Sequence, residues 1–131
     1  MDAALSLIYT KGVNRNLRSD KGTIILANEP RLLRELLANS LNIVWGNEVA
    51  LQMTVAGQLP ETIDRYHPAW VIVTLETLGD AALVIRGKTS SLNVLGLARD
   101  GQVAVVRRAV GDEETQVNLT LNMLYTILES G

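Results

Sequence analysis

The chain has 131 residues, of which 47% are hydrophobic and 20% charged, and its formal net charge is −2. This length and composition predict one folded domain that needs neither a metal ion nor a disulfide for its stability. Cysteine is absent and histidine occurs once, as His67, which excludes thiolate catalysis and cysteine-based zinc sites and argues against a Ser-His-Asp triad.

The small net charge gives no electrostatic reason to bind nucleic acid or an anionic membrane. No apolar run reaches the roughly 18–20 residues that span a bilayer. The first residues place an apolar stretch before the basic ones, the reverse of the order in a secretory signal. We therefore expect a cytoplasmic protein with no nucleic-acid or membrane partner, no metal ion and no cofactor.

Residues 1–22 differ in charge from the rest of the chain. They carry four basic and two acidic residues, a charge of +2, which leaves −4 for residues 23–131. They lack a sustained helical or strand period, so we predict an extension with one short ordered stretch near Ala3–Tyr9. Three roles stay open for it: a flexible tail, a partner-binding arm, or an extra element packed on a domain at residues 23–131.

A buried strand and a helix open that domain. Thr23–Ala27 is a short apolar run with β-branched residues, typical of a strand buried on both faces. Asn28-Glu29-Pro30 predicts a helix start, because proline fits the first helical turn. Polar residues, Arg34 among them, fall on the face of this helix that we expect to be exposed. The positions predicted to be buried are Leu32, Leu33, Leu36, Leu37, Leu41 and Val44.

Residues 48–75 supply two further strands and a short helix. Glu48–Val55 alternates between apolar and polar residues, which predicts an edge strand. Pro60–Tyr66 predicts two helical turns that end at His67-Pro68, since a residue before proline avoids the helical region. Ala69–Leu75 is almost wholly apolar and predicts the central strand, with Ile72 buried. Trp45 and Trp70 are expected in or near the core.

The last third of the chain departs from the alternation of strands and helices. Asp80–Arg86 predicts a short helix, and Leu92–Leu97 predicts a fourth strand. Arg99-Asp100-Gly101 is typical of a hairpin turn, so the valine-rich strand Gln102–Val110 must run antiparallel to its predecessor. An acidic loop then leads into a helix at Gln116–Glu129. The apolar stripe predicted for this helix is Val117, Leu121, Leu124 and Leu128.

The predicted element order is therefore β-α-β-α-β-α-β-β-α. Right-handed crossovers would place helices on both faces of a doubly wound, mostly parallel, five-stranded sheet. The fifth strand alone runs antiparallel, through the hairpin that joins it to the fourth. The fold class is α/β.

Three stretches resemble the receiver domain of response regulators. TIILANEPRLLRELLANSL is similar to the first strand and helix of that family, HPAWVIVTLE to its third strand, and SLNVLGLA to its fourth. The resemblance covers Thr23 to about Ala98. It implies a flavodoxin-like sheet with the strand order 2-1-3-4-5.

The residues that carry receiver chemistry are missing from these stretches. The acidic pair that binds Mg²⁺ falls on Asn28 and Glu29, the phosphoacceptor aspartate on Thr74, and the switch hydroxyl on Ala98. The lysine that follows the fifth strand in the family has no clear counterpart. Phosphoryl transfer from a phosphohistidine needs a carboxylate nucleophile and a cation held by several oxygen ligands. The resemblance thus implies a degenerate receiver that is neither phosphorylated nor an enzyme.

Alternatives stay open for several of these residues. Asn28 and Glu29 could line a polar pocket at the strand ends, where open α/β sheets bind ligands, or they could cap the first helix. Thr74 could be a satisfied strand-end hydroxyl or could contact a ligand or phosphoryl group. Arg107 and Arg108 could bind a partner, although charges on an edge strand also prevent aggregation.

The hairpin omits a helix that would cover part of the sheet, so we expect exposed apolar side chains that a partner covers. The predicted function is that of a stand-alone, non-phosphorylatable signalling protein that associates with a second copy, as a homodimer, or with another signalling protein. The alternative is a small-ligand sensor that uses the strand-end crevice. The predicted interface residues are Val103, Val105, Arg107, Leu121, Leu124 and Leu128.

Overall fold

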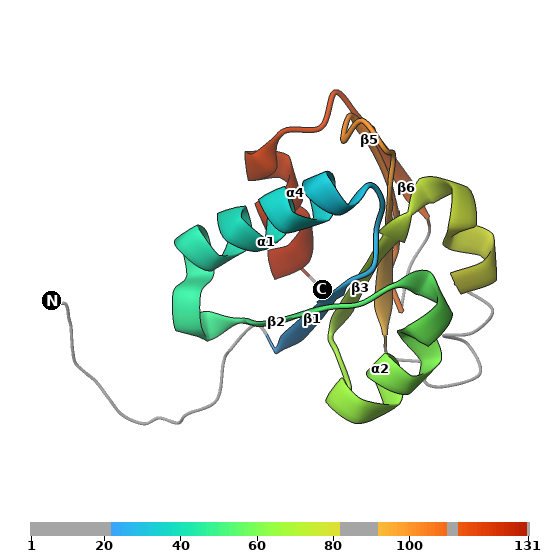
Figure 1. Cartoon of the computed structure of the whole chain (residues 1–131). Helices are drawn as coiled ribbons and strands as arrows, with labels where there is room; N and C mark the ends of the chain where they lie inside the picture. The colour runs from blue at the N-terminus through green and yellow to red at the C-terminus, as the bar shows by residue number, and fades with distance from the viewer. Residues whose placement is uncertain (1–21, 82–91, 110–112, 131) are drawn as a thin grey trace, which may run out of the picture.

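The computed structural model describes residues 22–81, 92–109 and 113–130, and these form a six-stranded mixed sheet with helices on both faces (Figure 1). The helices and strands are β1 (Thr23–Leu26), α1 (Arg31–Trp45), β2 (Ala50–Met53), α2 (Leu59–Tyr66), β3 (Trp70–Thr74), β4 (Asn93–Leu97), β5 (Val103–Arg107), β6 (Glu114–Val117) and α4 (Leu121–Glu129). Residues 78–81 begin a further helix. The predicted extension at residues 1–21 and most of the predicted helix Asp80–Arg86 lie outside the described ranges.

The strand order is β2-β1-β3-β4-β5-β6. β1 pairs in parallel with β2 and β3, and β3 pairs in parallel with β4. β5 is antiparallel to both of its neighbours, β4 and β6. The α/β class and the antiparallel hairpin are confirmed, and β2 is an edge strand as predicted. The order 2-1-3-4-5 is matched only in part, because a sixth strand extends the sheet beyond β5.

That sixth strand corrects the predicted start of the last helix. Glu114–Val117 pairs with β5, with Val103 opposite Val117 and Val106 opposite Glu114, whereas α4 begins only at Leu121. The free edge of β5 offers these residues backbone partners that a short sequence window does not reveal. The hydroxyl of Thr120 then caps α4 by accepting a hydrogen bond from the Met123 N–H at 3.2 Å.

The β4–β5 hairpin forms at the predicted turn. Gly101 has a φ of 76°, a left-handed conformation that glycine adopts without steric cost. Its N–H donates to the Ala98 carbonyl, and the Gln102 N–H donates to the Asp100 carboxylate, both at 2.9 Å. The chain therefore reverses within a few residues, and no helix crosses the sheet between β4 and β5.

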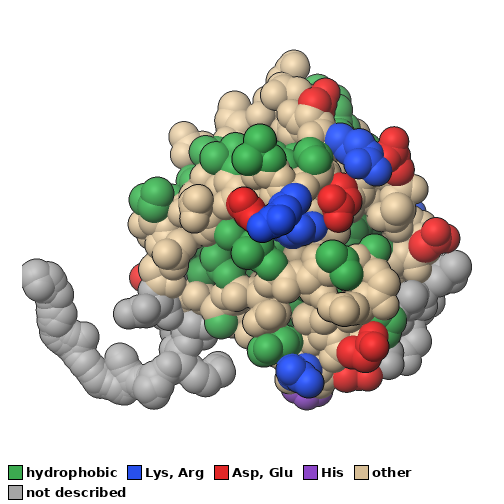
Figure 2. All heavy atoms as spheres, viewed as in Figure 1, with side chains coloured by type: hydrophobic (Ala, Val, Ile, Leu, Met, Phe, Trp, Pro, Cys, Tyr) green, Lys and Arg blue, Asp and Glu red, His purple; other side chains and the backbone are tan. Residues whose placement is uncertain are grey.

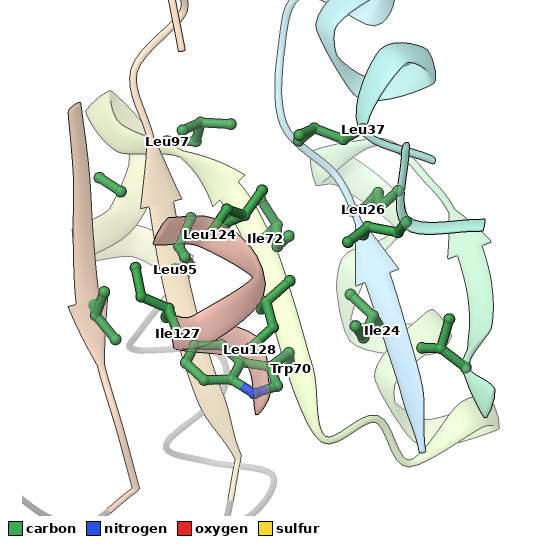
Figure 3. Close-up of a cluster of buried hydrophobic side chains, with 14 of the residues drawn as sticks. Ile24, Leu26, Leu37, Trp70, Ile72, Leu95, Leu97, Leu124, Ile127 and Leu128 are labelled. Atoms are coloured by element: carbon green, nitrogen blue, oxygen red, sulfur yellow. The ribbon is translucent and has the colours of Figure 1, made fainter. Parts of the chain in front are cut away.

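Two hydrophobic cores lie on opposite faces of the sheet, because successive strand residues point to opposite sides. Ile24 and Leu26 pack with α1 and α4 in the first core, whereas Ile25 and Ala27 pack with α2 and the helical residues 78–81 in the second. Figure 3 shows α4 lying on the first face, with its leucines beside β3 and β4. The α4 side chains in this core are Leu124, Ile127 and Leu128.

The buried face of α1 differs from the predicted one. Leu37, Leu41 and Trp45 are buried as a stripe at four-residue spacing, and Arg34 joins them one turn earlier. Leu36, predicted to be buried, is 57% exposed, and Leu32 and Val44 are exposed as well. The helix carries apolar residues around most of its circumference, so periodicity alone allowed more than one buried face. The tryptophans behave as predicted, since both are buried in the first core.

Candidate functional site

The candidate site lies at the carboxyl ends of β1 and β3, where open α/β sheets bind their ligands. Asn28 and Glu29 follow β1, and Thr74 is the last residue of β3. The Glu29 N–H donates to the Thr74 hydroxyl oxygen at 2.8 Å. The structure thus brings three of the four predicted site residues together.

The fourth predicted residue, Ala98, belongs to the hairpin. It follows Leu97, the register partner of Thr74 on the neighbouring strand. Its N–H donates to the Val103 carbonyl at 2.9 Å, and its methyl group provides no hydrogen-bonding atom. Ala98 therefore shares the sheet edge with the site and adds no chemistry to it.

Arg34 is the site residue that the sequence interpretation missed. It was expected on the exposed face of α1, yet it is only 9% exposed. One guanidinium nitrogen, Nη1, donates to the Asn28 carbonyl at 3.2 Å and to the Glu29 carboxylate at 3.1 Å. The signal was its spacing, since Arg34 precedes the buried Leu37 and Leu41 by three and seven residues and so shares their face.

Neither Asn28 nor Glu29 caps α1, which corrects that alternative. The cap position is Pro30, which has no side-chain capping bond, and the Glu29–Pro30 peptide is cis. The Glu29 carboxylate bonds to Arg34 instead. The first turn closes through the Arg34 N–H, which donates to the Pro30 carbonyl at 3.1 Å.

The Asn28 side chain is fully buried and has no hydrogen-bond partner for either its oxygen or its nitrogen among the described residues. An unpaired buried amide costs about 1–3 kcal/mol per group. Packing alone would favour an apolar residue here. The unpaired Asn28 amide at the carboxyl end of β1 therefore lowers the stability of the fold.

The polar groups around Glu29 and Thr74 form a cluster whose members bond to one another. The Thr74 hydroxyl accepts from Glu29, the Thr74 carbonyl accepts from the Thr77 hydroxyl at 3.0 Å, and the Glu29 carboxylate is held by Arg34. No group of three or more His, Cys, Asp or Glu residues within the described ranges could hold a metal ion. The cluster ties the β1–α1 junction to β3, and it presents no carboxylate pair and no nucleophile beside a base.

Two hollows flank the cluster. One, of about 240 Å³, lies on the α2 side, and its lining is mostly apolar. The other, of about 310 Å³, lies between α1 and the end of β2, and its lining is more polar. In the second hollow Arg31 donates to Glu35 at 2.7 Å, and this hydrogen bond raises the pKa of the Arg31 guanidinium. The residues lining the first hollow are Ala27, Ala56, Gly57, Leu59, Pro60, Val73, Thr77, Asp80 and Ala81.

The structure buries two of the six residues of the predicted interface and leaves the other four at least partly exposed. Leu124 and Leu128 are buried against the sheet, so they cannot contact a partner. Val103, Val105 and Arg107 are half-buried on the opposite face of β5, and Leu121 is exposed at the start of α4. The apolar stripe predicted for the last helix is thus also wrong at Leu121, and at Val117, which is exposed on β6.

Arg107 and Arg108 do not protect an edge, because β5 pairs with strands on both sides. Arg107 forms an ion pair with Glu113. Arg108 pairs with Glu114 at 3.0 Å and donates to the Ser130 hydroxyl at 2.7 Å. Arg107 therefore ties the residue before β6 to β5, and Arg108 ties β6 and the end of α4 to the chain that follows β5.

An exposed apolar surface lies along the outer face of α1, which we define as Leu32, Leu36, Asn39 and Ile43. The three hydrophobic members are 78%, 57% and 84% exposed, respectively. Figure 2 shows hydrophobic side chains over α1 beside a small group of charged ones. The sequence of α1 contains two apolar repeats, one at this outer face and one at Leu37, Leu41 and Trp45. The predicted buried face combines residues of both repeats.

No protein-family model, curated protein or solved structure matches this chain. In residues 22–81, 92–109 and 113–130, no helix is long and apolar enough to cross a membrane.

Proposed function

We propose that this chain is a receiver-like binding protein that acts by associating with a second copy of itself, without phosphoryl transfer. The observation that carries this proposal is the outer face of α1, where three large hydrophobic side chains project into solvent. Large apolar patches on a folded protein mark places where another surface docks.

The composition of α1 supports the same conclusion. Its charged residues are Arg31, Arg34 and Glu35, all in the first five positions, and residues 36–45 contain none. An exposed helix face in a monomer carries charged residues opposite its buried stripe. Ten uncharged residues with Leu36 and Ile43 pointing outward fit a helix whose second face is also covered.

The polar cluster supports the absence of phosphoryl transfer. The phosphoacceptor place holds Thr74, whose hydroxyl already accepts a hydrogen bond from the Glu29 backbone. The only carboxylate in the cluster, that of Glu29, is neutralised by Arg34 at 3.1 Å. A cation cage needs several oxygen ligands, and a phosphoryl group needs a nucleophile that can attack it. This cluster offers one carboxylate, which is paired with Arg34, and one hydroxyl, which already accepts a hydrogen bond.

Two measurements test the proposal on the full chain. Intact-mass analysis after incubation with acetyl phosphate and Mg²⁺ should show no adduct, and a stoichiometric phosphoryl adduct would contradict the degenerate-receiver interpretation. Sedimentation velocity over a concentration series should show a dimer that dissociates on dilution. Ile43→Lys should abolish this dimer, whereas Val117→Lys, a matched change on the exposed face of β6, should leave it intact. A wild-type chain that stays monomeric at millimolar concentration would overturn the proposed function.

A second candidate function is binding of a small, mostly apolar ligand at the strand ends. The hollow of about 240 Å³ beside Ala27 and Val73 favours it, together with the unpaired amide of the neighbouring Asn28. Concave, largely apolar sites with a few polar groups are typical of ligand pockets. Native mass spectrometry of the protein purified from its host would test this candidate, because a ligand retained in the hollow adds its mass and Ala81→Trp should remove it.

A further inference from the structure

We propose that two copies pair through antiparallel packing of α1 on α1, with Leu32 of one copy against Ile43 of the other and Leu36 against Asn39. This inference builds on the proposed self-association and adds the surface, the direction of the helices and the register. All four residues of this face are exposed, so no described element covers them.

The spacing of the outer face of α1 carries the first step. Its members follow one another at intervals of four, three and four residues, the spacing of the seam positions in a two-helix coiled coil. All four residues are exposed. The intervals are also the same in both directions along the helix. Two copies related by a twofold axis therefore match each seam residue with another seam residue, as an isologous interface requires.

The charges of α1 decide the direction of packing. Arg31 and Glu35 lie in the first five residues of the helix, and residues 36–45 carry no charge. Parallel packing would place each of these charges next to its own copy, which is unfavourable because like charges repel. Antiparallel packing places the charged end of one helix against the uncharged end of the other. Glu35 then faces Asn42 of the second copy, so no charges of like sign meet.

Asn39 refines the register. In the antiparallel arrangement it lies near the twofold axis, within about one helical turn of the same residue in the second copy. A single polar residue in an otherwise apolar seam lowers affinity but favours the register in which it finds a polar partner. A shift by one heptad would move Ile43 in one direction, or Leu32 in the other, past the end of the facing helix and leave it in solvent.

The size of this surface sets the expected affinity. α1 is 15 residues long, or about 22 Å. An interface of that length and of helix width buries only a few hundred Å² of accessible surface on each copy, whereas a standard stable interface buries roughly 800 Å² per partner. We therefore expect a reversible dimer with a dissociation constant in the micromolar range. Asn39→Leu should tighten it at least tenfold.

Cysteine pairing tests the register directly, because the chain contains no cysteine of its own. Residues 32 and 43 are separated by about 16 Å along one helix, which is too far for a disulfide within a chain, since bridged Cα atoms lie within about 7 Å of each other. Under mild oxidation, the double variant Leu32→Cys/Ile43→Cys should give a covalent dimer. An equimolar mixture of the two single variants should also cross-link, whereas each single variant alone should stay monomeric on a non-reducing gel. Val117→Cys serves as the control for random collision.

The outcomes separate this inference from the proposed function. Cross-linking of either single variant by itself would indicate parallel or non-specific contact and would overturn the register. A wild-type chain that sediments as a dimer while the double variant fails to cross-link would overturn the α1 interface and leave self-association standing. A wild-type chain that is monomeric at every concentration would overturn both. Urea unfolding of each variant, monitored by circular dichroism, checks that it is folded.

Discussion

Replacing Arg34 with methionine tests whether the buried guanidinium holds the β1–α1 junction to the rest of the fold. The methionine keeps an unbranched, largely apolar stem and removes the two hydrogen bonds that Nη1 donates. The matched control is Arg31→Met, three residues earlier on the same helix. Arg31 also pairs with a glutamate, but its side chain is 79% exposed, against 11% for that of Arg34.

The expected difference follows from these environments. A hydrogen bond from a charged donor contributes about 1.5–3 kcal/mol to stability, and the Asn28 carbonyl loses this bond inside the protein, where water cannot replace it. The Glu29 carboxylate is 42% exposed, so water solvates it once Arg34 is gone. We therefore expect Arg34→Met to lower the free energy of unfolding by about 2 kcal/mol. For Arg31→Met we expect a clearly smaller loss, because an ion pair between solvent-exposed side chains contributes little to stability.

Urea denaturation followed by circular dichroism measures both changes. With a slope near 2 kcal/mol per molar urea, Arg34→Met should move the midpoint down by about 1 M, and Arg31→Met should move it clearly less. Equal shifts for the two variants would refute the reasoning, because they would show that burial of Arg34 and its bond to the Asn28 carbonyl add nothing beyond a surface ion pair.

Four further substitutions test the packing and one hydrogen bond. Leu41→Ala should lower stability by about 2–5 kcal/mol because it leaves a cavity in the first core. Leu36→Ala, on the outer face of α1, should cost less than about 1 kcal/mol. Equal urea midpoints for the two variants would mean that the buried face of α1 is assigned wrongly. Gly96→Ala should cost about 1–3 kcal/mol, since overpacking is destabilising. The new Cβ would lie 3.3 Å from the Leu75 Cα and 3.1 Å from a Leu78 methyl group. A thermal midpoint at the wild-type value would contradict this prediction. Thr74→Val should cost about 1–2 kcal/mol because the Glu29 N–H loses its acceptor, and a gain in stability would show that this bond contributes nothing.

Local sequence signals were sufficient for most of the elements. Short β-branched runs predicted β1 and β3, because strands buried on both faces are apolar throughout. The Arg99-Asp100-Gly101 turn predicted the antiparallel β5, since so short a connection cannot join parallel strands. The motifs also located Asn28, Glu29 and Thr74 at the ends of adjacent strands, where the structure brings them together.

Tertiary structure decided what local patterns left ambiguous. β6 forms because β5 has a free edge, which is a property of the sheet and not of residues 114–117. The buried face of α1 is fixed by what packs beneath it, because the helix offers two apolar stripes and only contact with the sheet and α4 selects Leu37, Leu41 and Trp45. Arg34 enters the site for the same reason: once that stripe faces the sheet, its guanidinium lies beside the Asn28 carbonyl and the Glu29 carboxylate. Packing of α4 on the sheet likewise buries Leu124 and Leu128, which the sequence pattern had placed at an interface. The exposed apolar side chains lie on the outer face of α1 instead.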